Sequence, residues 1–237
     1  MNLINSPSFP SGHTTYGYMG SLLLAVLVPD RYQEMVVRAA EYGNDRIILG
    51  AHYAMDVLGG RAVATYDLAH LLANDPAYIG RPLTDFARAT TMSAPRVPET
   101  ISDFRAAVAN ARTDLTKVLE AACGDTVQVC ARQDNGRFNA PAMNEAFYAS
   151  TQTYGLPVVH SEIADKVEDV GTLAPEAGYL LTMAFPKLSL EEANRILTET
   201  EGPGGGFLDD GSAFGVYSRL NLYAAAGRAA ALSRAKP

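Results

Sequence analysis

The sequence predicts an all-α protein, and its amino-acid composition and the positions of its prolines both indicate this class. Alanine is abundant, tryptophan is absent and runs of β-branched residues are few, so intrinsic propensity favours helix over strand. Proline also stands at the start of several apolar segments, where its fixed backbone angle suits the first turn of a helix. We therefore expect a helical bundle.

Three helices are expected in the first third of the chain. The first covers residues 11–28 and is stopped by Pro29-Asp30, with Asp30 as the cap of a second helix over residues 31–49. Gly50 then breaks the pattern, and a third helix follows over residues 52–73. The apolar run at residues 17–28 makes roughly 18 Å of helix, which is short of a bilayer core of about 30 Å. We expect this run to be a buried core helix, without stable membrane insertion.

Shorter helices are expected in the remainder of the chain, over residues 76–89, 98–122, 141–154, 175–185, 189–199 and 216–233. Linker-like segments occur at residues 93–98 and 202–206, and we interpret the second, Gly-Pro-Gly-Gly-Gly, as a flexible connection. Neither is long enough to mark a domain boundary. The expected organisation is a single domain over residues 1–237, in which residues 93–237 form a helical C-terminal extension packed on a core of residues 1–92.

Charge and cysteine content restrict the partners and the compartment. The net charge of −7 and the scattered basic residues argue against a nucleic-acid partner. Cys123 and Cys130 flank a polar segment that could loop back to join them in a disulfide, which would imply an oxidising compartment; the alternative is two buried thiols in the cytosol. No histidine lies nearby, so we expect no metal site there.

The start of the chain does not have the pattern of a secretory leader. Residues 2–7 have neither a basic start nor an apolar centre. We expect a periplasmic or secreted protein whose signal peptide is absent from this chain.

Pro10-Ser11-Gly12-His13-Thr14 places a hydroxyl, a bare amide and an imidazole at the start of the first expected helix. Unpaired amides and the helix dipole favour an oxyanion at such a position. Arg46, His52 and Asp56 form the second half of the candidate site and supply a guanidinium, an imidazole and a carboxylate. His52 and Asp56 are four residues apart, so on a helix the carboxylate can orient the imidazole and leave its other nitrogen free to attack phosphorus. Alone, such a pair is more often structural, but together with Pro-Ser-Gly-His it predicts a phosphate site.

These residues resemble two signature motifs of a known family. Pro10-Ser11-Gly12-His13 and the segment from Arg46 to Asp56 are similar to the second and third motifs of the type 2 phosphatidic acid phosphatase (PAP2) superfamily. That superfamily contains bacterial class A nonspecific acid phosphatases, integral membrane lipid phosphatases and vanadium-dependent haloperoxidases, and this chain most resembles the first. The resemblance implies a bundle of that type and hydrolysis of a small phosphomonoester without a cofactor.

The resemblance also implies a role for each residue of the two motifs. His52 would form a phosphohistidine, Asp56 would orient it and His13 would protonate the leaving group. Arg46, Ser11 and the Gly12 amide would hold the phosphoryl oxygens. Tyr16, Tyr18 and Tyr53 lie close to the motifs, and they would either line the substrate pocket or pack in the core.

Two departures from the family pattern bear on activity. The superfamily's first motif, a lysine followed after six residues by Arg-Pro, is not found before Pro10, and the Arg81-Pro82 pair lies downstream without the lysine. We expect a family member without its N-terminal helices, weakened in activity by the loss of two cationic ligands. Such a chain would expose apolar helix faces that a homodimer could cover. The second departure is Asp45, where the family has serine; its carboxylate would either repel phosphate or pair with Arg46.

Two other functions fit the same residues. In a haloperoxidase they would hold vanadate, with His52 bound directly to the metal, whereas in a phosphatase vanadate would act only as an inhibitor. In a non-catalytic oxyanion-binding remnant, phosphate would bind without turnover.

Overall fold

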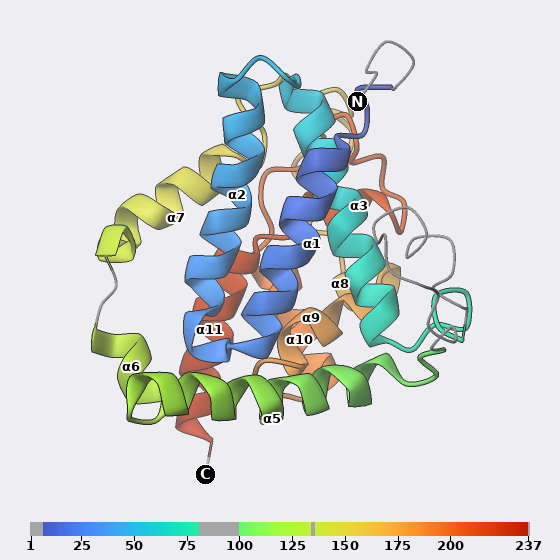
Figure 1. Cartoon of the computed structure of the whole chain (residues 1–237). Helices are drawn as coiled ribbons and strands as arrows, with labels where there is room; N and C mark the ends of the chain where they lie inside the picture. The colour runs from blue at the N-terminus through green and yellow to red at the C-terminus, as the bar shows by residue number, and fades with distance from the viewer. Residues whose placement is uncertain (1–6, 81–99, 134–135, 237) are drawn as a thin grey trace.

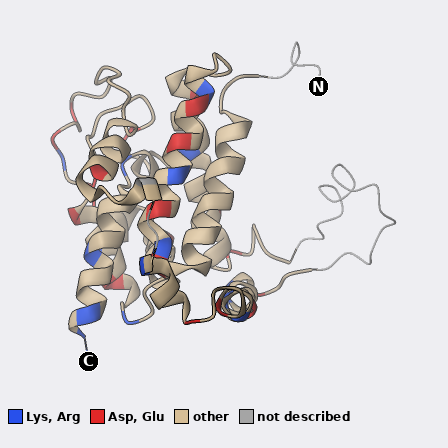
Figure 2. Cartoon of the chain, turned by 60° about the vertical axis from the view of Figure 1, so that its left-hand side comes forward, with Lys and Arg blue, Asp and Glu red and all other residues tan. Residues whose placement is uncertain are grey.

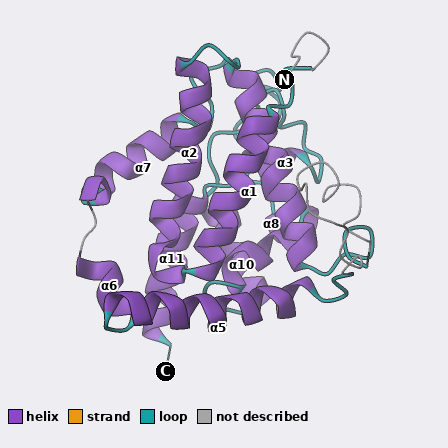
Figure 3. Ribbon diagram, viewed as in Figure 1, coloured by secondary structure: helices purple, strands orange, loops and turns teal. Residues whose placement is uncertain are grey.

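The protein is a helical bundle in the part of the chain that the structure describes. This structure, a computed structural model, describes residues 7–80, 100–133 and 136–236. Every regular element within these ranges is an α-helix or a 3₁₀ turn, as predicted, and none is a strand (Figure 3). The predicted linker at residues 93–98 and most of the helix predicted over residues 76–89 lie outside the described residues, while residues 76–80 form turns.

Three long helices run side by side, each antiparallel to the one before it (Figure 1). They are α1 (Gly12–Leu27), α2 (Tyr32–Ile48) and α3 (Ala54–Leu72). The prediction of Asp30 as a helix cap is wrong: Asp30 lies in the 3₁₀ turn η2 (Pro29–Arg31), and α2 begins without a side-chain cap. The starts of α1 and α3 and the end of α2 consequently meet at one end of the bundle (Figure 1).

Glycines on α1 and α2 allow these helices to approach closely. A methyl group on Gly17 would lie 2.2 Å from the Tyr42 ring of α2, so that ring packs directly on the α1 backbone. A methyl group on Gly43 would lie 2.9 Å from Val57 of α3. The three helices therefore pack closely, and a larger side chain at Gly17 or Gly43 would disrupt these contacts.

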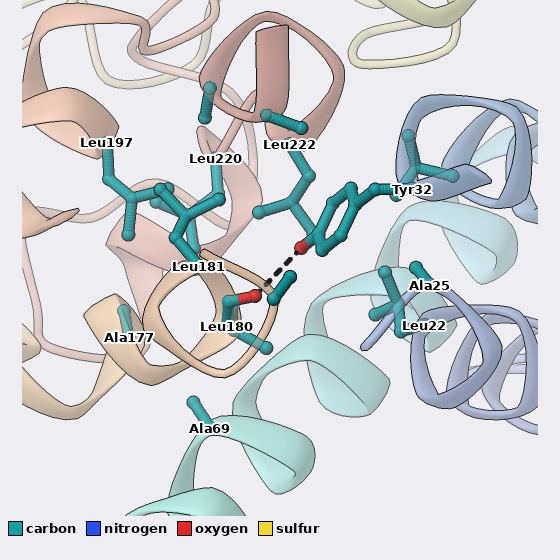
Figure 4. Close-up of a cluster of buried hydrophobic side chains, with 14 of the residues drawn as sticks. Leu22, Ala25, Tyr32, Ala69, Ala177, Leu180, Leu181, Leu197, Leu220 and Leu222 are labelled. Atoms are coloured by element: carbon teal, nitrogen blue, oxygen red, sulfur yellow. Dashed lines mark hydrogen bonds between the residues drawn. The ribbon is translucent and has the colours of Figure 1, made fainter. Parts of the chain in front are cut away.

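The C-terminal third packs against this trio through short elements: α8 (Val170–Leu173), η4 (Pro175–Gly178), α9 (Tyr179–Thr182), α10 (Leu190–Glu199), η5 (Gly215–Ser218) and α11 (Leu222–Ala235). One cluster of buried hydrophobic side chains extends from Tyr18 on α1 to Ala229 on α11. Within it the buried Tyr32 hydroxyl donates to the Leu180 carbonyl at 3.0 Å, so the phenol is both packed and hydrogen-bonded (Figure 4).

Helix α5 (Phe104–Cys123) crosses the opposite end of the bundle, and Val108 is its one fully buried side chain among the described residues (Figure 1). Arg112 anchors it by donating to the carbonyls of Val26 and Met183. A guanidinium at the C-terminal end of α1 is favoured by the helix dipole.

The segment after α5 contains the two cysteines. Cys123 and Cys130 form a disulfide with a Cα–Cα distance of 6.5 Å, as predicted. The sequence did not predict α6 (Val127–Gln133), which begins inside the segment expected to loop back. One more 3₁₀ turn, η3 (Gly136–Phe138), leads to α7 (Pro141–Ser150).

The prediction of residues 202–206 as a flexible connection is wrong. Gly202 donates to the Arg219 carbonyl at 2.7 Å, and the Gly205 carbonyl accepts from Val159 and His160. Gly204 and Gly205 are buried. A methyl group on Gly204 would lie 2.7 Å from a backbone carbonyl, so the segment is glycine-rich because it is tightly packed.

Two features of the described residues concern binding partners. Lys and Arg are interspersed with Asp and Glu over the described helices (Figure 2). None of the helices within the described ranges is both long enough and apolar enough to cross a bilayer.

Candidate active site

The start of α1 is organised by Ser11. Its hydroxyl oxygen accepts from the Thr14 amide at 3.1 Å, the N-cap arrangement that fixes the first turn. Ser11 itself is fully buried, whereas Gly12 and His13, the first two residues of α1, are exposed. Amides at these helix positions have no intrahelical acceptor, so the first turn presents N–H groups and the positive end of the dipole.

The start of α3 is organised by Asp56. This carboxylate is 4% exposed, and its Oδ2 accepts from the Tyr53 amide at 3.0 Å. The same oxygen lies 3.4 Å from Nδ1 of His52. With the proton on Nδ1, the imidazole is held in one orientation and its Nε2 carries a lone pair.

The structure brings these two helix starts into contact. His13 Nδ1 lies 3.2 Å from His52 Nε2, and the two rings meet edge to face with centroids 5.4 Å apart. The Ser11 amide donates to the Asp56 carbonyl at 2.9 Å. Asp56, His52 and His13 therefore form a continuous chain of hydrogen-bonding groups that ends at the exposed His13.

This contact requires a glycine on α3. A methyl group on Gly60 would lie 2.6 Å from the Ser11 carbonyl and 2.9 Å from Thr14. The Thr15 hydroxyl bridges the two helices by donating to the carbonyls of Ser11 and Gly60 at 3.0 and 3.3 Å. Gly60 was not predicted as a site residue, although it follows Asp56 by one helical turn, where close packing is a common reason for glycine.

Arg46 joins the site from the last turn of α2. Its carbonyl accepts from the amides of Ala51 and His52 at 2.9 and 3.2 Å, and Gly50 makes the return turn with a φ of +68°. This turn resembles a helix C-cap, in which glycine takes the left-handed conformation that other residues avoid. The backbone of Arg46 is thereby tied directly to His52.

The guanidinium of Arg46 is supported by Tyr42, which the sequence did not identify as important. The guanidinium carbon lies 4.6 Å from the Tyr42 ring centroid, and the Tyr42 ring lies on Gly17 of α1. Arg46 is one turn beyond Tyr42, and His13 is one turn before Gly17. Because the two helices are antiparallel, Arg46 and His13 lie at the same level of the bundle.

The Arg46 side chain retains capacity for an anion. Its Nε is buried and has no hydrogen-bond partner among the described residues. Of the two alternatives for Asp45, an ion pair with Arg46 is not found among the described residues.

Aromatic residues near the motifs divide into two groups. Tyr18 is 1% exposed and belongs to the core. Tyr16 and Tyr53 are 67% and 79% exposed, and each lies within one turn of a site histidine. A substrate approaching the histidines would therefore meet phenol rings at the rim of the site.

The site contains the oriented imidazole of His52 and the His13 imidazole in contact with Nε2 of His52. It also contains amides at a helix start and the guanidinium of Arg46. These are the components needed to hold an oxyanion and to transfer a group to nitrogen with proton donation to a leaving oxygen. The described residues contain no group of three or more histidine, cysteine or carboxylate side chains placed to hold a metal ion.

Comparison with known proteins gives the same assignment for this segment. Residues 2–75 match the PAP2 superfamily. Over 64 residues the chain is 45% identical to a non-specific acid phosphatase of Salmonella typhimurium and 44% identical to one of Salmonella typhi. It is 42% identical over 64 residues to an acid phosphatase of Zymomonas mobilis.

These similarities cover only part of each protein. The aligned residues are 27% of this chain and 26%, 26% and 24% of the three relatives, so the chain spans about a quarter of the length of the proteins it matches. No solved structure matches the chain. All six predicted site residues lie within the segment that matches the superfamily.

Proposed function

We propose that this chain, whose residues 2–75 match the PAP2 superfamily, hydrolyses small phosphomonoesters through a phosphohistidine, as an acid-phosphatase-like enzyme. The observation that carries this proposal is the chain of contacts from Asp56 through His52 to His13. An imidazole oriented by a buried carboxylate, with a second imidazole at its reactive nitrogen, fits nucleophilic attack followed by proton transfer.

The proposed reaction has two steps. In the first, His52 Nε2 attacks phosphorus, the bond from phosphorus to the ester oxygen breaks, and His13 donates a proton to the departing alcohol. In the second, water attacks the phosphohistidine, His13 accepts the water proton, and the phosphorus–nitrogen bond breaks to release phosphate. Asp56 stabilises the cationic imidazole that exists between the two steps.

Substrate binding requires His13 to move. The 3.2 Å contact between His13 Nδ1 and His52 Nε2 leaves no room for a phosphoryl group between the two nitrogens. His13 is exposed, so its ring can rotate outward while Ser11 and Asp56 hold the helix starts together. The phosphoryl oxygens would then lie against the Gly12 amide, the Ser11 hydroxyl and Arg46.

We further propose that turnover by this chain alone is slow. Among the described residues, Arg46 is the cationic side chain that the helix register brings level with the histidines. Loss of a donor to developing charge costs on the order of 10² to 10³ in rate. With Arg46 as the one guanidinium that the described residues bring to the site, charge stabilisation is lower than the family's three motifs imply.

The disulfide supports an oxidising compartment for this function. A bond between Cys123 and Cys130 persists in the periplasm or outside the cell and is rare in the cytosol. We therefore propose a periplasmic or secreted protein acting on small, soluble phosphomonoesters.

The test is hydrolysis of p-nitrophenyl phosphate at mildly acidic pH by the wild type, His52→Ala and His160→Ala. His160 is the matched control because it lies outside the site, in contact with Glu162 at 3.6 Å. We expect His52→Ala to lose on the order of 10³-fold or more in kcat and His160→Ala to retain the wild-type rate.

A second measurement tests the intermediate itself. An alkaline quench followed by mass spectrometry should locate a phosphoryl group on His52 during turnover. Equal rates for the wild type and His52→Ala would refute the phosphatase proposal. Binding of phosphate or vanadate without any turnover would leave only the function of an oxyanion-binding protein.

A further inference from the structure

Arg61 on α3 is a buried arginine outside the candidate phosphate site. It is 3% exposed, and its Nη2 donates to the Leu220 carbonyl at 2.8 Å and to the Tyr148 hydroxyl at 3.2 Å. Its Nη1 is buried and has no partner among the described residues. A guanidinium remains protonated in proteins, so this is a buried cation. Its carbon lies 4.9 Å from the Tyr148 ring centroid and 6.0 Å from the Tyr18 ring centroid, while Nη1 keeps an unused donor.

No described carboxylate balances this charge. The buried acids Glu168, Glu201 and Asp209 all pair with Arg219, and none forms an ion pair with Arg61. The strongest electrostatic neighbours of Arg61 are three phenols, of which Tyr154 has its pKa raised to about 12 by burial. A buried charge without a counter-ion is costly, so an anion that reached Arg61 would be bound favourably.

Arg61 lines a cavity of about 210 Å³, the Arg61 cavity. Most of its wall is apolar and is formed by Leu58, Leu156, Pro157, Val158, Phe207 and Leu208. Gln152 also lines it, and its Oε1 is a second buried polar atom without a described partner. An engineered cavity of about 150 Å³ binds benzene, so this cavity can hold a ligand with one ring.

The Arg61 cavity is separate from the phosphate site. Leu58 and Arg61 are three residues apart and share one face of α3. Arg61 lies roughly 140° around the helix from Asp56, so the cavity opens on a different flank of α3 from the His52 and Asp56 pair. The Gly-Pro-Gly-Gly-Gly segment closes this flank through Pro203, Gly204 and Gly206.

We propose that the Arg61 cavity binds a small organic monocarboxylate with an apolar body, such as an aromatic acid. The carboxylate accepts from Arg61 and the ring lies against the leucine, proline and phenylalanine side chains. A planar carboxylate matches the fork of a guanidinium, whereas a phosphate dianion needs more donors than this apolar wall supplies. Occupation of the cavity is independent of the phosphatase proposal.

The experiment is titration of the full chain with benzoate, followed by calorimetry and ligand-observed NMR. Benzamide is the neutral isostere and inorganic phosphate is the competitor. We expect saturable one-to-one binding of benzoate, binding of benzamide weaker by tenfold or more, and no competition by phosphate. His52→Ala should bind benzoate as the wild type does.

Two variants locate the site. Arg61→Gln removes the charge and should weaken benzoate binding by tenfold or more. Gly206→Leu should fill the cavity and abolish binding without altering Arg61, because a methyl group on Gly206 meets nothing within 4 Å. Gly20→Leu is its matched control, since Gly20 also has open space but lies on the exposed face of α1.

Each outcome decides the proposal. Absence of benzoate binding, equal binding of benzamide, competition by phosphate, or full binding by Gly206→Leu would each overturn it. If Arg61→Gln does not fold, the comparison of Gly206→Leu with Gly20→Leu gives the answer alone.

Discussion

At the scale of single residues, Asp56 connects the fold to the proposed chemistry. Its carboxylate caps the start of α3 through the Tyr53 amide and orients His52, while its carbonyl accepts from Ser11. A carboxylate at the start of a helix also interacts favourably with the helix dipole. One residue therefore positions both halves of the candidate phosphate site.

The substitution Asp56→Asn should separate these roles. The amide oxygen of the new side chain can still accept from the Tyr53 amide, so the fold is expected to persist. The amide cannot hold the His52 proton in the same way or stabilise an imidazolium, and by analogy with other carboxylate–histidine pairs kcat should fall on the order of 10³ to 10⁴.

The control is Asp67→Asn on the same helix. Asp67 accepts from the Tyr78 hydroxyl at 3.2 Å and lies three turns beyond Asp56 on α3, away from His13 and His52, so kcat should change little. Circular dichroism verifies folding of both variants. A wild-type kcat for a folded Asp56→Asn protein would exclude the orienting role.

The placement of Ser11, His52 and Asp56 at the helix starts could be predicted because it depends on local sequence. Ser11 precedes its helix as a cap, and His52 and Asp56 share a helical face by spacing alone. The supports of the site could not be predicted in this way. The Tyr42 ring packs on Gly17 of α1 and thereby supports the Arg46 guanidinium. No sequence pattern within α2 reveals the contact between Tyr42 and Gly17.

At the scale of elements, the first three helices and α10 were predicted closely, whereas the start of α5 and the shortest elements were not. α1, α2 and α3 differ from their predicted bounds by one or two residues at each end. The segment predicted as one helix over residues 175–185 is instead η4 followed by α9, and α8 was missed entirely. A four-residue helix has too few periodic positions to be recognised, and tertiary packing decides its conformation.

The contact between α1 and α3 gives a prediction at this scale. Gly60→Ala should destabilise the protein by about 2 kcal/mol, because its methyl group would lie 2.6 Å from the Ser11 carbonyl, a backbone atom that cannot move alone. The shift should also separate His13 from His52 and lower phosphatase activity. Chemical denaturation measures the first effect and steady-state kinetics the second.

Gly20→Ala is the matched substitution within α1. Nothing lies within 4 Å of its added methyl group, so the better helix propensity of alanine should raise stability by about 0.5 to 1 kcal/mol. Opposite signs for the two variants would support the close approach of α1 and α3. Equal effects would contradict it.

At the scale of the whole molecule, the C-terminal third is held by a buried charge cluster. Arg219 lies 2.8 Å from Glu201, 3.7 Å from Glu168 and 3.9 Å from Asp209, so one guanidinium faces three carboxylates. The cluster joins segments far apart in sequence, because Arg219 also donates to the Lys166 carbonyl and its own carbonyl accepts from Gly202. Sequence could not predict this arrangement, since the four residues lie in separate turns without a common pattern.

This excess of carboxylates makes stability depend on pH. Burial raises the pKa of Glu201 to about 7 despite the opposing effect of Arg219, and burial together with Asp209 raises the pKa of Glu168. The ordinary glutamate pKa is 4.5, so the folded state binds protons that the unfolded state releases. The resulting stabilisation is complete below pH 4.5 and is lost as the pH rises through about 7.

The thermal midpoint of the wild type should consequently fall between about pH 5 and about pH 8, and Glu201→Gln should flatten that fall, because its side chain stays neutral throughout. Glu192→Gln is the control. Lys236 and the cap of α10 lower the pKa of Glu192 to about 2, so its contribution is present above pH 4.5, is lost only as the pH falls toward 2, and is constant across this window. Calorimetry of the three proteins should show parallel slopes for the wild type and Glu192→Gln; a wild-type slope in Glu201→Gln would mean that the Arg219 cluster does not sense pH.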